Sequence, residues 1–278
     1  MLTIKDHSRD SAGMKYVYPV ISRRAGGVSV GINLNVNNAC NWACVYCQVP
    51  NLTRGGPPPV DLDQLEIELR QFLRDVTTGD FLIKHVEPEA RQLMDLAFSG
   101  NGEPTSAPEF AAAVERVVRV MREFDLPDSV KLRLITNGSL MFRPAVRQGI
   151  AAIGAFAGGE VWFKLDQATE AGIERINGVR LTPEKIRESL LVCAGLAPTW
   201  IQTCYFAMDE LETDEAGRAA YLELIASVRE KIKGVHLYGL ARPSLQPQAS
   251  RLSNLKEERF LQFARSISSL GIEVVANP

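Results

Sequence analysis

The sequence is poor in several residues that build common scaffolds and sites. Its 278 residues include only five cysteines and three histidines, and aromatic residues make up 7%. An odd number of cysteines argues against a framework of disulfides. The formal net charge is only −2, so the chain as a whole has no attraction for nucleic acid or an anionic membrane surface.

Long hydrophobic runs are missing as well. No segment approaches the run of about 20 apolar residues that is needed to cross a bilayer. Residues 1–15 are polar and mixed in charge, and they lack the apolar core of a secretory signal. We therefore expect a cytoplasmic protein that has no membrane partner.

Apolar strand-like runs alternate with amphipathic helical stretches along the chain. The expected strands are residues 28–36, 93–99, 131–136, 160–165, 199–206 and 234–240, with a further short candidate at 271–276. The expected helices are residues 61–75, 108–124, 182–193, 215–231 and 254–270. This alternation predicts parallel strands with helical crossovers. We expect an α/β fold, a partial (β/α)6 TIM-like barrel over residues 17–278 that follows an N-terminal extension at residues 1–16, with an open doubly wound sheet as the alternative.

Unusual polar residues follow these strands, where parallel α/β folds place their functional groups. They are Cys40, residues 100–104, Asn137, Asp166 and Arg242. One face of the fold is therefore expected to collect them.

Three of the five cysteines, Cys40, Cys44 and Cys47, have the spacing CxxxCxxC. Thiolates are soft ligands suited to iron–sulfur clusters and zinc. Three thiolates on one short loop can bind three corners of a cubane and leave the fourth iron open to an exchangeable ligand. A structural zinc ion needs four closed ligands, and all three histidines are distant in sequence. Zinc, an electron-transfer cluster with four protein ligands, and three inert buried cysteines are the alternatives.

This spacing, with Tyr46 before the last cysteine, resembles the radical SAM superfamily, and the later motifs fit in order. The resemblance implies that Cys40, Cys44 and Cys47 bind one [4Fe–4S] cluster and that Tyr46 lies near the adenine of S-adenosylmethionine (SAM). It also implies that SAM is cleaved reductively to a 5′-deoxyadenosyl radical, which abstracts hydrogen from a substrate. An external one-electron reductant such as flavodoxin or ferredoxin is then required.

Residues 99–105, SGNGEPT, look like the glycine–glutamate–proline motif of that family. Gly100 and Gly102 let the backbone approach a ligand closely. Glu103 offers an acceptor for the amino group of SAM, and Asn101, which replaces a glycine, tolerates left-handed backbone geometry. An ordinary strand-to-helix turn is the alternative.

Five further residues are weaker candidates. Asn137 lies in an Asn-Gly turn and could face the SAM ribose or the substrate. Lys164 and Asp166 point to the same side of their strand, as a ligand-facing couple or as a structural ion pair. Cys204 is a candidate hydrogen donor or a small buried residue, and Arg242 is a candidate ligand for SAM or substrate or a solvated arginine. The catalytic candidates are thus Lys164, Asp166 and Cys204.

Residues 22–33, 46–48, 164–166 and 174–177 together resemble the radical SAM branch related to the wyosine-forming tRNA enzymes. Those enzymes carry a second three-cysteine cluster, for which only Cys193 and Cys204 remain here. The substrate stays open between RNA, a peptide and a small molecule; the basic residues Lys15, Arg23 and Arg24 leave room for RNA. A tRNA-modifying enzyme and a non-catalytic iron–sulfur carrier or sensor are the alternative functions.

Overall fold

The structure is a computed structural model that describes residues 13–22 and 26–278. Residues 1–12, most of the expected N-terminal extension, lie outside the described residues, as do Arg23 and Arg24.

A curled sheet forms the centre of the described part of the chain. Its eight strands there are β1 (Val17–Ser22), β2 (Gly27–Ile32), β5 (Leu93–Phe98), β6 (Lys131–Thr136), β7 (Gly159–Lys164), β8 (Thr199–Cys204), β10 (Gly234–Tyr238) and β12 (Val274–Asn277), adjacent in that order. β1 runs antiparallel to β2, and the other neighbouring pairs are parallel.

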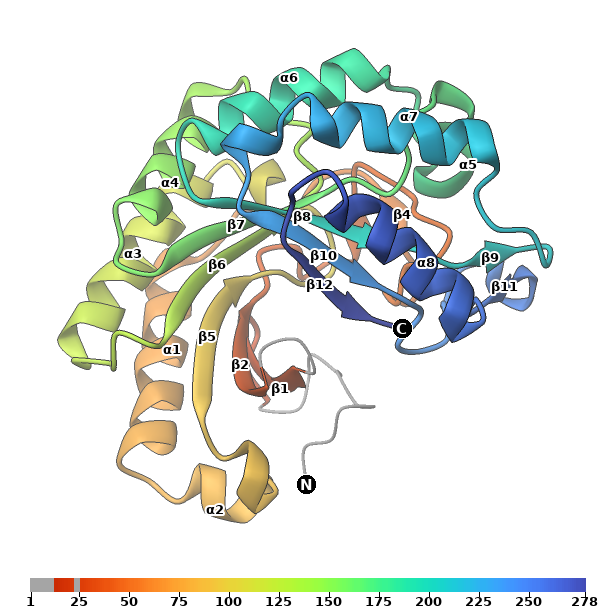
Figure 1. Cartoon of the computed structure of the whole chain (residues 1–278). Helices are drawn as coiled ribbons and strands as arrows, with labels where there is room; N and C mark the ends of the chain where they lie inside the picture. Colours follow the sequence, from red (N-terminus) through yellow and green to blue (C-terminus); the bar gives the residue numbers. More distant parts are fainter. Residues whose placement is uncertain (1–12, 23–25) are drawn as a thin grey trace.

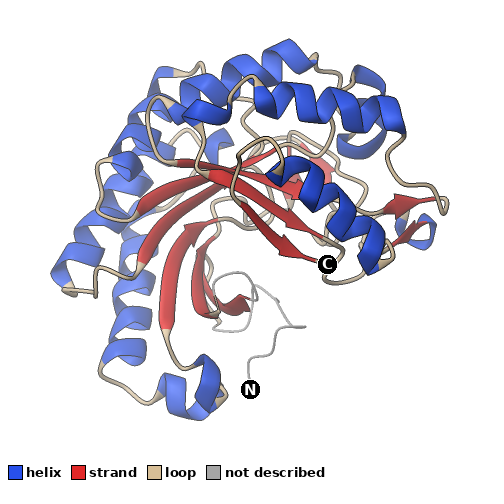
Figure 2. Ribbon diagram, in the orientation of Figure 1, coloured by secondary structure: helices blue, strands red, loops and turns tan. Residues whose placement is uncertain are grey.

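Helices follow the outer face of this sheet and leave its inner face to the interior of the partial barrel (Figures 1 and 2). They are α1 (Leu62–Thr77), α2 (Phe81–His85), α3 (Phe110–Glu123), α4 (Pro144–Gly154), α5 (Glu170–Asn177), α6 (Pro183–Ala194), α7 (Glu215–Ala226) and α8 (Glu257–Ser268). Two small ribbons, β3 (Ala39–Cys40) with β4 (Thr53–Arg54) and β9 (Ala207–Met208) with β11 (Leu252–Ser253), complete the described strands.

The predicted partial barrel of parallel strands is confirmed, and the doubly wound alternative is wrong because the crossover helices lie along one face of the sheet. The described residues contain six units of a parallel strand followed by a helix, as expected, and the short run at 271–276 adds a seventh parallel strand, β12. The sequence analysis also missed β1. This strand contains Pro19, which cannot donate a ladder hydrogen bond and is tolerated because β1 ends the sheet.

Along strand β6, alternate side chains face the apolar core and the barrel interior. Leu132 and Leu134 are fully buried in the main apolar core, together with Val117 of α3 and Ile150 of α4. The alternating residues of β6 are only partly buried, because they face the barrel interior. The apolar core therefore lies between sheet and helices, and the inner face is left for polar and ligand-facing side chains.

Paired charges occupy the barrel interior near the amino ends of the strands. Arg133 donates to Glu160 Oε1 at 2.6 Å and pairs with Asp95, and its guanidinium lies 4.7 Å from the centre of a Trp162 ring. Because buried charges are costly unless they are partnered, this arrangement keeps Arg133 stable inside the barrel. It fills the end opposite the cysteines, which follow the carboxyl end of β2.

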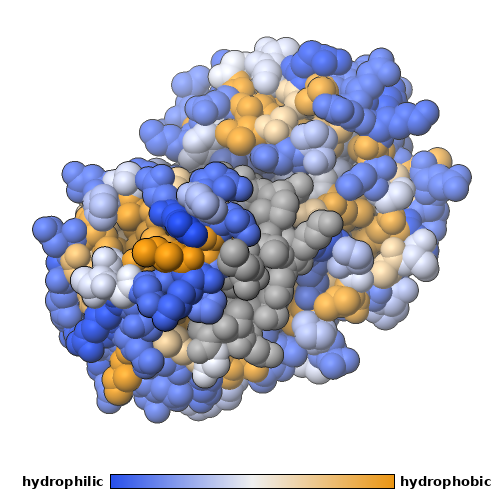
Figure 3. All heavy atoms as spheres, turned by 90° about the horizontal axis from the view of Figure 1, so that it is seen from below, coloured by the Kyte–Doolittle hydropathy of each residue, from blue (hydrophilic) through white to orange (hydrophobic). Residues whose placement is uncertain are grey.

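The exposed large hydrophobic residues come from separate parts of the chain: Ile67, Ile83, Phe142, Leu211 and Leu245. Figure 3 shows one face of the molecule, on which hydrophilic and hydrophobic residues are intermixed. In the described part of the chain, no helix has the length and apolar character needed to cross a membrane.

Candidate functional site

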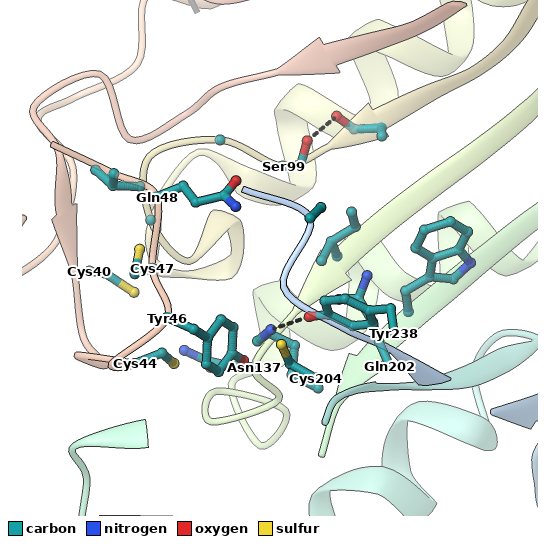
Figure 4. Close-up of a pocket in the computed structure, with 18 of the residues that line it drawn as sticks. Cys40, Cys44, Tyr46, Cys47, Gln48, Ser99, Asn137, Gln202, Cys204 and Tyr238 are labelled. Atoms are coloured by element: carbon teal, nitrogen blue, oxygen red, sulfur yellow. Dashed lines mark hydrogen bonds between the residues drawn. The ribbon is translucent and has the colours of Figure 1, made fainter. Parts of the chain in front are cut away.

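The predicted cysteine motif forms a loop, residues 40–49, at the carboxyl end of the barrel strands. Cys40 ends β3, and Cys40, Cys44 and Cys47 are all partly exposed to one cavity of about 320 Å³. Figure 4 shows the three thiols on one side of this cavity and Gln202, Cys204 and Tyr238 on the other. Small-molecule sites commonly begin at about 300 Å³, so the cavity can take a ligand beside the cysteines.

The carboxyl end of α5 supports this loop from one side. The backbone amides of Ala43 and Val45 donate to the carbonyl oxygens of Asn177 at 3.1 Å and Ile176 at 2.9 Å. Gly178 ends the helix in the left-handed conformation with φ of 63°, and a Cβ at this position would lie 2.7 Å from the Ala43 carbonyl oxygen. Only glycine allows both the helix end and the close approach of the loop.

The segment of residues 242–248, which follows β10, holds the loop from another side. Ser244 Oγ donates to the Val45 carbonyl at 2.7 Å. The Cys47 carbonyl accepts from the Leu245 amide at 3.0 Å and from Gln246 Nε2 at 3.2 Å. The loop is therefore held in shape by contacts from distant parts of the chain.

The donor chemistry of the loop fits a cluster that is bound by three thiolates. Burial raises the pKa of Cys40 to about 11 and that of Cys44 to about 12, so both thiols stay protonated at neutral pH until a metal displaces the protons. The Trp42 amide and Asn177 Nδ2 point at the sulfurs of Cys40 and Cys44, at 3.5 and 3.4 Å. Among the described residues, no group of three or more His, Cys, Asp or Glu side chains is arranged to hold a metal ion, and this includes the three cysteines.

The glycine loop, residues 99–105, packs directly against the cysteine loop. A Cβ on Gly102 would lie 2.1 Å from the Ala39 carbonyl oxygen, so this residue must be glycine for the two loops to meet. Gly100, Gly102 and Glu103 line the cavity. Asn101 is turned toward the loops, because its amide Nδ2 donates to Asn38 Oδ1 at 2.6 Å.

The Glu103 carboxylate is buried and bridges two strand ends. Oε1 accepts from the Thr105 amide at 3.1 Å, from Thr105 Oγ1 at 2.6 Å and from Thr136 Oγ1 at 2.7 Å. Oε2 accepts from the Asn137 amide at 2.7 Å. Burial raises the pKa of Glu103 despite these donors. Oε2 accepts from one donor and Oε1 from three, so Oε2 is the oxygen with room for a further donor.

Asn137 lines the cavity and also joins two loops. Its Nδ2 donates to Asn41 Oδ1 at 2.9 Å, and its Oδ1 accepts from Ser139 Oγ at 2.7 Å. The side chain is thus part of the turn, and it also holds Asn41, the residue after Cys40, by a hydrogen bond.

Comparison with known proteins identifies this architecture. TYW1 with a lysine–pyruvate adduct bound is 15% identical, with a TM-score of 0.58, covering 97% of this chain and 79% of that chain. A radical SAM methyltransferase from Sphaerobacter thermophilus is 14% identical with a TM-score of 0.61, over 94% of this chain and 68% of that chain. Streptococcus suis SuiB bound to precursor peptide SuiA is 10% identical with a TM-score of 0.60, over 91% and 49%.

The chain has the radical SAM fold. Its resemblance to radical SAM enzymes, including the wyosine-forming TYW1, agrees with the resemblance expected from the sequence.

Some sequence relatives of this chain carry the family label UPF0026 in their names. A UPF0026 protein of Methanocaldococcus jannaschii is 32% identical over 180 residues, which cover 62% of this chain and 47% of that protein. A UPF0026 protein of Helicobacter pylori is 26% identical over 164 residues, covering 57% and 44%. The chain therefore matches less than half the length of these relatives, and no protein-family model matches it.

Lys164 and Asp166 do not pair with each other in the described residues. Asp166 accepts from Tyr46 Oη at 2.5 Å and from the Cys204 amide at 2.9 Å. Lys164 Nζ instead lies 3.3 Å from Tyr238 Oη and 4.9 Å from the centre of the Tyr46 ring. Burial lowers the pKa of Lys164, but nearby Tyr238 and Asp166 raise it to a net increase, so the amine facing the cavity is charged. Both residues thus contact Tyr46, and the alternative of a structural ion pair between them is not formed in the described residues.

The remaining predicted residues divide between the cavity and the core. Arg242 is partly exposed and lines the cavity, and its carbonyl oxygen accepts from Gln48 Nε2 at 3.3 Å. Cys204 also lines the cavity and is 2% exposed. Cys193 is fully buried in the main core, away from the cysteine loop.

Four site residues carried no sequence signal that assigned them a role. Asn177 precedes the helix-ending Gly178, a pattern that marks a helix terminus but not its target. Ser244 contacts a loop that is nearly 200 residues away in sequence. Phe206 lies edge-to-face against Tyr46 with ring centres 5.5 Å apart, and Gln202, 2% exposed, lines the cavity.

Proposed function

We propose that this chain is a radical SAM enzyme in which Cys40, Cys44 and Cys47 hold one [4Fe–4S] cluster. The observation that carries the proposal is that the three thiols share a single cavity with the glycine loop. When bound and reduced, such a cluster supplies the electron that cleaves SAM into methionine and a 5′-deoxyadenosyl radical, which abstracts hydrogen from the substrate.

The protein's part in this reaction is to bind, orient and exclude water. Glu103 Oε2 is placed to accept from the SAM amino group, at the acceptor position that its other partners leave open. Tyr46 and Leu240 line the cavity and pack against the buried residues Val45, Phe206 and Met208, so they offer an apolar surface for the adenine. Arg242 and Asn137 line the same cavity and are the further candidates for contacts with SAM.

The substrate would occupy the part of the cavity toward the barrel floor. Ile135, Gln202 and Tyr238 line this part, and the Gln202 amide carries both a donor and an acceptor for a polar group. Lys164, Asp166 and Cys204 stay the catalytic candidates. RNA, a peptide and a small molecule all stay open as substrates. The likeness to TYW1 is the observation that would support a tRNA-modifying activity. A cytoplasmic location and a flavodoxin- or ferredoxin-type reductant belong to this proposal.

Substitution of the cysteines tests the proposal. Singly replacing Cys40, Cys44 or Cys47 by Ala should abolish the intact cluster and all SAM cleavage, because each thiol binds one corner. The anaerobically reconstituted wild type should hold about four irons per chain. Cys193→Ala and Cys204→Ala are the matched controls and should retain the cluster.

Iron content, visible absorbance and 5′-deoxyadenosine formation with dithionite are the measurements. A fully loaded wild type that neither cleaves SAM nor changes its spectrum with SAM would instead indicate a non-catalytic iron–sulfur carrier or sensor. About eight irons per chain would contradict the single cluster.

A further inference from the structure

The side chain of Asn177 lies next to Cys44 of the cysteine loop. Asn177 is 2% exposed at the last position of α5. Its Nδ2 lies 3.4 Å from Cys44 Sγ and donates to Asp166 Oδ2 at 2.7 Å. Because the carboxylate accepts only, the amide nitrogen must be the atom that faces both Asp166 and the sulfur.

The surroundings of Asn177 prevent the amide from turning away. Asp166 is itself held by the Tyr46 hydroxyl at 2.5 Å and by the Cys204 amide at 2.9 Å. At the other end of the residue, the Asn177 carbonyl oxygen accepts from the Ala43 amide at 3.1 Å. Backbone and side chain of Asn177 are thus fixed independently, and one N–H points at Cys44.

This contact distinguishes Cys44 from the other two cysteines. The Cys40 sulfur accepts from the backbone amide of Trp42 at 3.5 Å, and this donor does not depend on the side chain at position 42. Among the residues that the structure describes, Asn177 is the side chain whose N–H reaches a sulfur of the loop. It is therefore the donor that a single substitution can remove.

A hydrogen bond to a cysteine sulfur stabilises negative charge on that sulfur. The charge is greater when an iron–sulfur cluster is reduced, so the bond is stronger in the reduced state and raises the reduction potential. Residues that contact the ligands from behind tune metal sites in this way.

We propose that Asn177 is a positioning residue that raises the reduction potential of the cluster through its hydrogen bond to Cys44. This inference rests on the proposed function, because it assumes a cluster on the three cysteines. It assigns a role to a residue outside the cysteine motif and the glycine loop.

The test compares midpoint potentials of reconstituted proteins without SAM. Asn177→Leu keeps a similar side-chain volume and removes the donor, so its potential should be more negative than that of the wild type. Asn254→Leu is the matched control, since it makes the same change from amide to leucine at a residue whose side chain bonds the Leu240 backbone and no cysteine. Its potential should stay at the wild-type value. Redox titration monitored by electron paramagnetic resonance gives each value at equal iron loading.

Two results would overturn the inference: equal potentials in Asn177→Leu and wild type, or the same shift in both variants, which would indicate a general disturbance of the loop. If Asn177→Leu loses its cluster, a measurement on the wild type tests the inference instead. Isotopic labelling of asparagine side-chain nitrogen should give a hyperfine coupling to the reduced cluster, and its absence would contradict the contact. A wild type that binds no cluster refutes the proposed function itself, whereas normal SAM cleavage with an unchanged potential refutes only the role of Asn177.

Discussion

At the scale of single residues, Glu103 combines a structural and a ligand-binding position. Its carboxylate joins the end of β5 to the end of β6 through Thr105, Thr136 and Asn137. The same group borders the cavity next to the cysteines. A substitution here therefore acts on the fold and on SAM binding, and the experiment must separate the two effects.

We predict that Glu103→Ala keeps the cluster and weakens SAM binding. Losing a charge-assisted hydrogen bond costs on the order of 1.5–3 kcal/mol, or roughly tenfold and upward in affinity. The buried donors of Thr136 and Asn137 lose their partner as well, so the free energy of unfolding should fall by about 1–3 kcal/mol. SAM affinity at equal iron loading and thermal unfolding are the measurements.

Thr105→Val is the control for the Glu103 experiment. It removes a hydroxyl donor from Oε1 and leaves Oε2 in place, so it should lower stability while SAM affinity stays near wild type. Wild-type affinity in Glu103→Ala would remove Glu103 from the SAM site and weaken the assignment of the whole glycine loop.

At the scale of elements, the cysteine loop depends on segments that contribute no cysteine. The end of α5 and the 242–248 segment make side-chain and backbone hydrogen bonds to it from opposite ends of the motif. A loop that is held in place before the metal binds loses less conformational entropy on binding. The effect of these hydrogen bonds on the cysteine loop should therefore be measurable in the metal-free protein.

We predict that Ser244→Ala loosens the cysteine loop without unfolding the barrel. The variant loses the hydrogen bond to the Val45 carbonyl, and a typical hydrogen bond contributes about 0.5–1.5 kcal/mol. Exchange of the backbone amides in residues 43–49 should then become roughly two- to tenfold faster, as measured by hydrogen exchange in the metal-free protein.

Asn254→Ala is the matched control for Ser244→Ala. Asn254 bonds the amide and carbonyl of Leu240, which precedes the 242–248 segment, so its loss should leave exchange in residues 43–49 unchanged. Equal exchange in Ser244→Ala and wild type would show that the segment does not support the loop.

At the scale of the whole molecule, one apolar core runs through the described chain. Buried residues from Tyr16 to Ile272 belong to a single cluster between the sheet and its helices. A shared core favours cooperative unfolding. This arrangement accords with the expectation of one barrel domain over residues 17–278, which stays a prediction.

We predict a single unfolding transition for the metal-free protein. Far-ultraviolet and near-ultraviolet circular dichroism should give the same midpoint, because helices and core side chains unfold together. Phe163→Leu, at a fully buried position of β7, should lower the free energy of unfolding by about 0.5–3 kcal/mol and shift both signals equally. Two separate midpoints would instead divide the chain into independent units.

The sequence by itself determined the kind of fold and the metal motif. Strand and helix periodicity, and a spacing such as that of Cys40, Cys44 and Cys47, are set by neighbours along the chain, so they can be recognised without a structure. The positions of Gly102 and Glu103 after their strand follow from the same local logic. The edge strand β1 escaped this reasoning because its pairing is antiparallel and Pro19 weakens its strand pattern.

Only the tertiary structure decided which side chains meet around the motif. Alternation along the strand predicted Lys164 and Asp166 on one side, but the closure of the sheet brings Asp166 to Tyr46 and Lys164 to Tyr238. Asn177 reaches Cys44 across 133 positions of sequence for the same reason. Such contacts depend on how strands and helices pack around the curled sheet, and the packing arises from the whole core instead of from any local pattern.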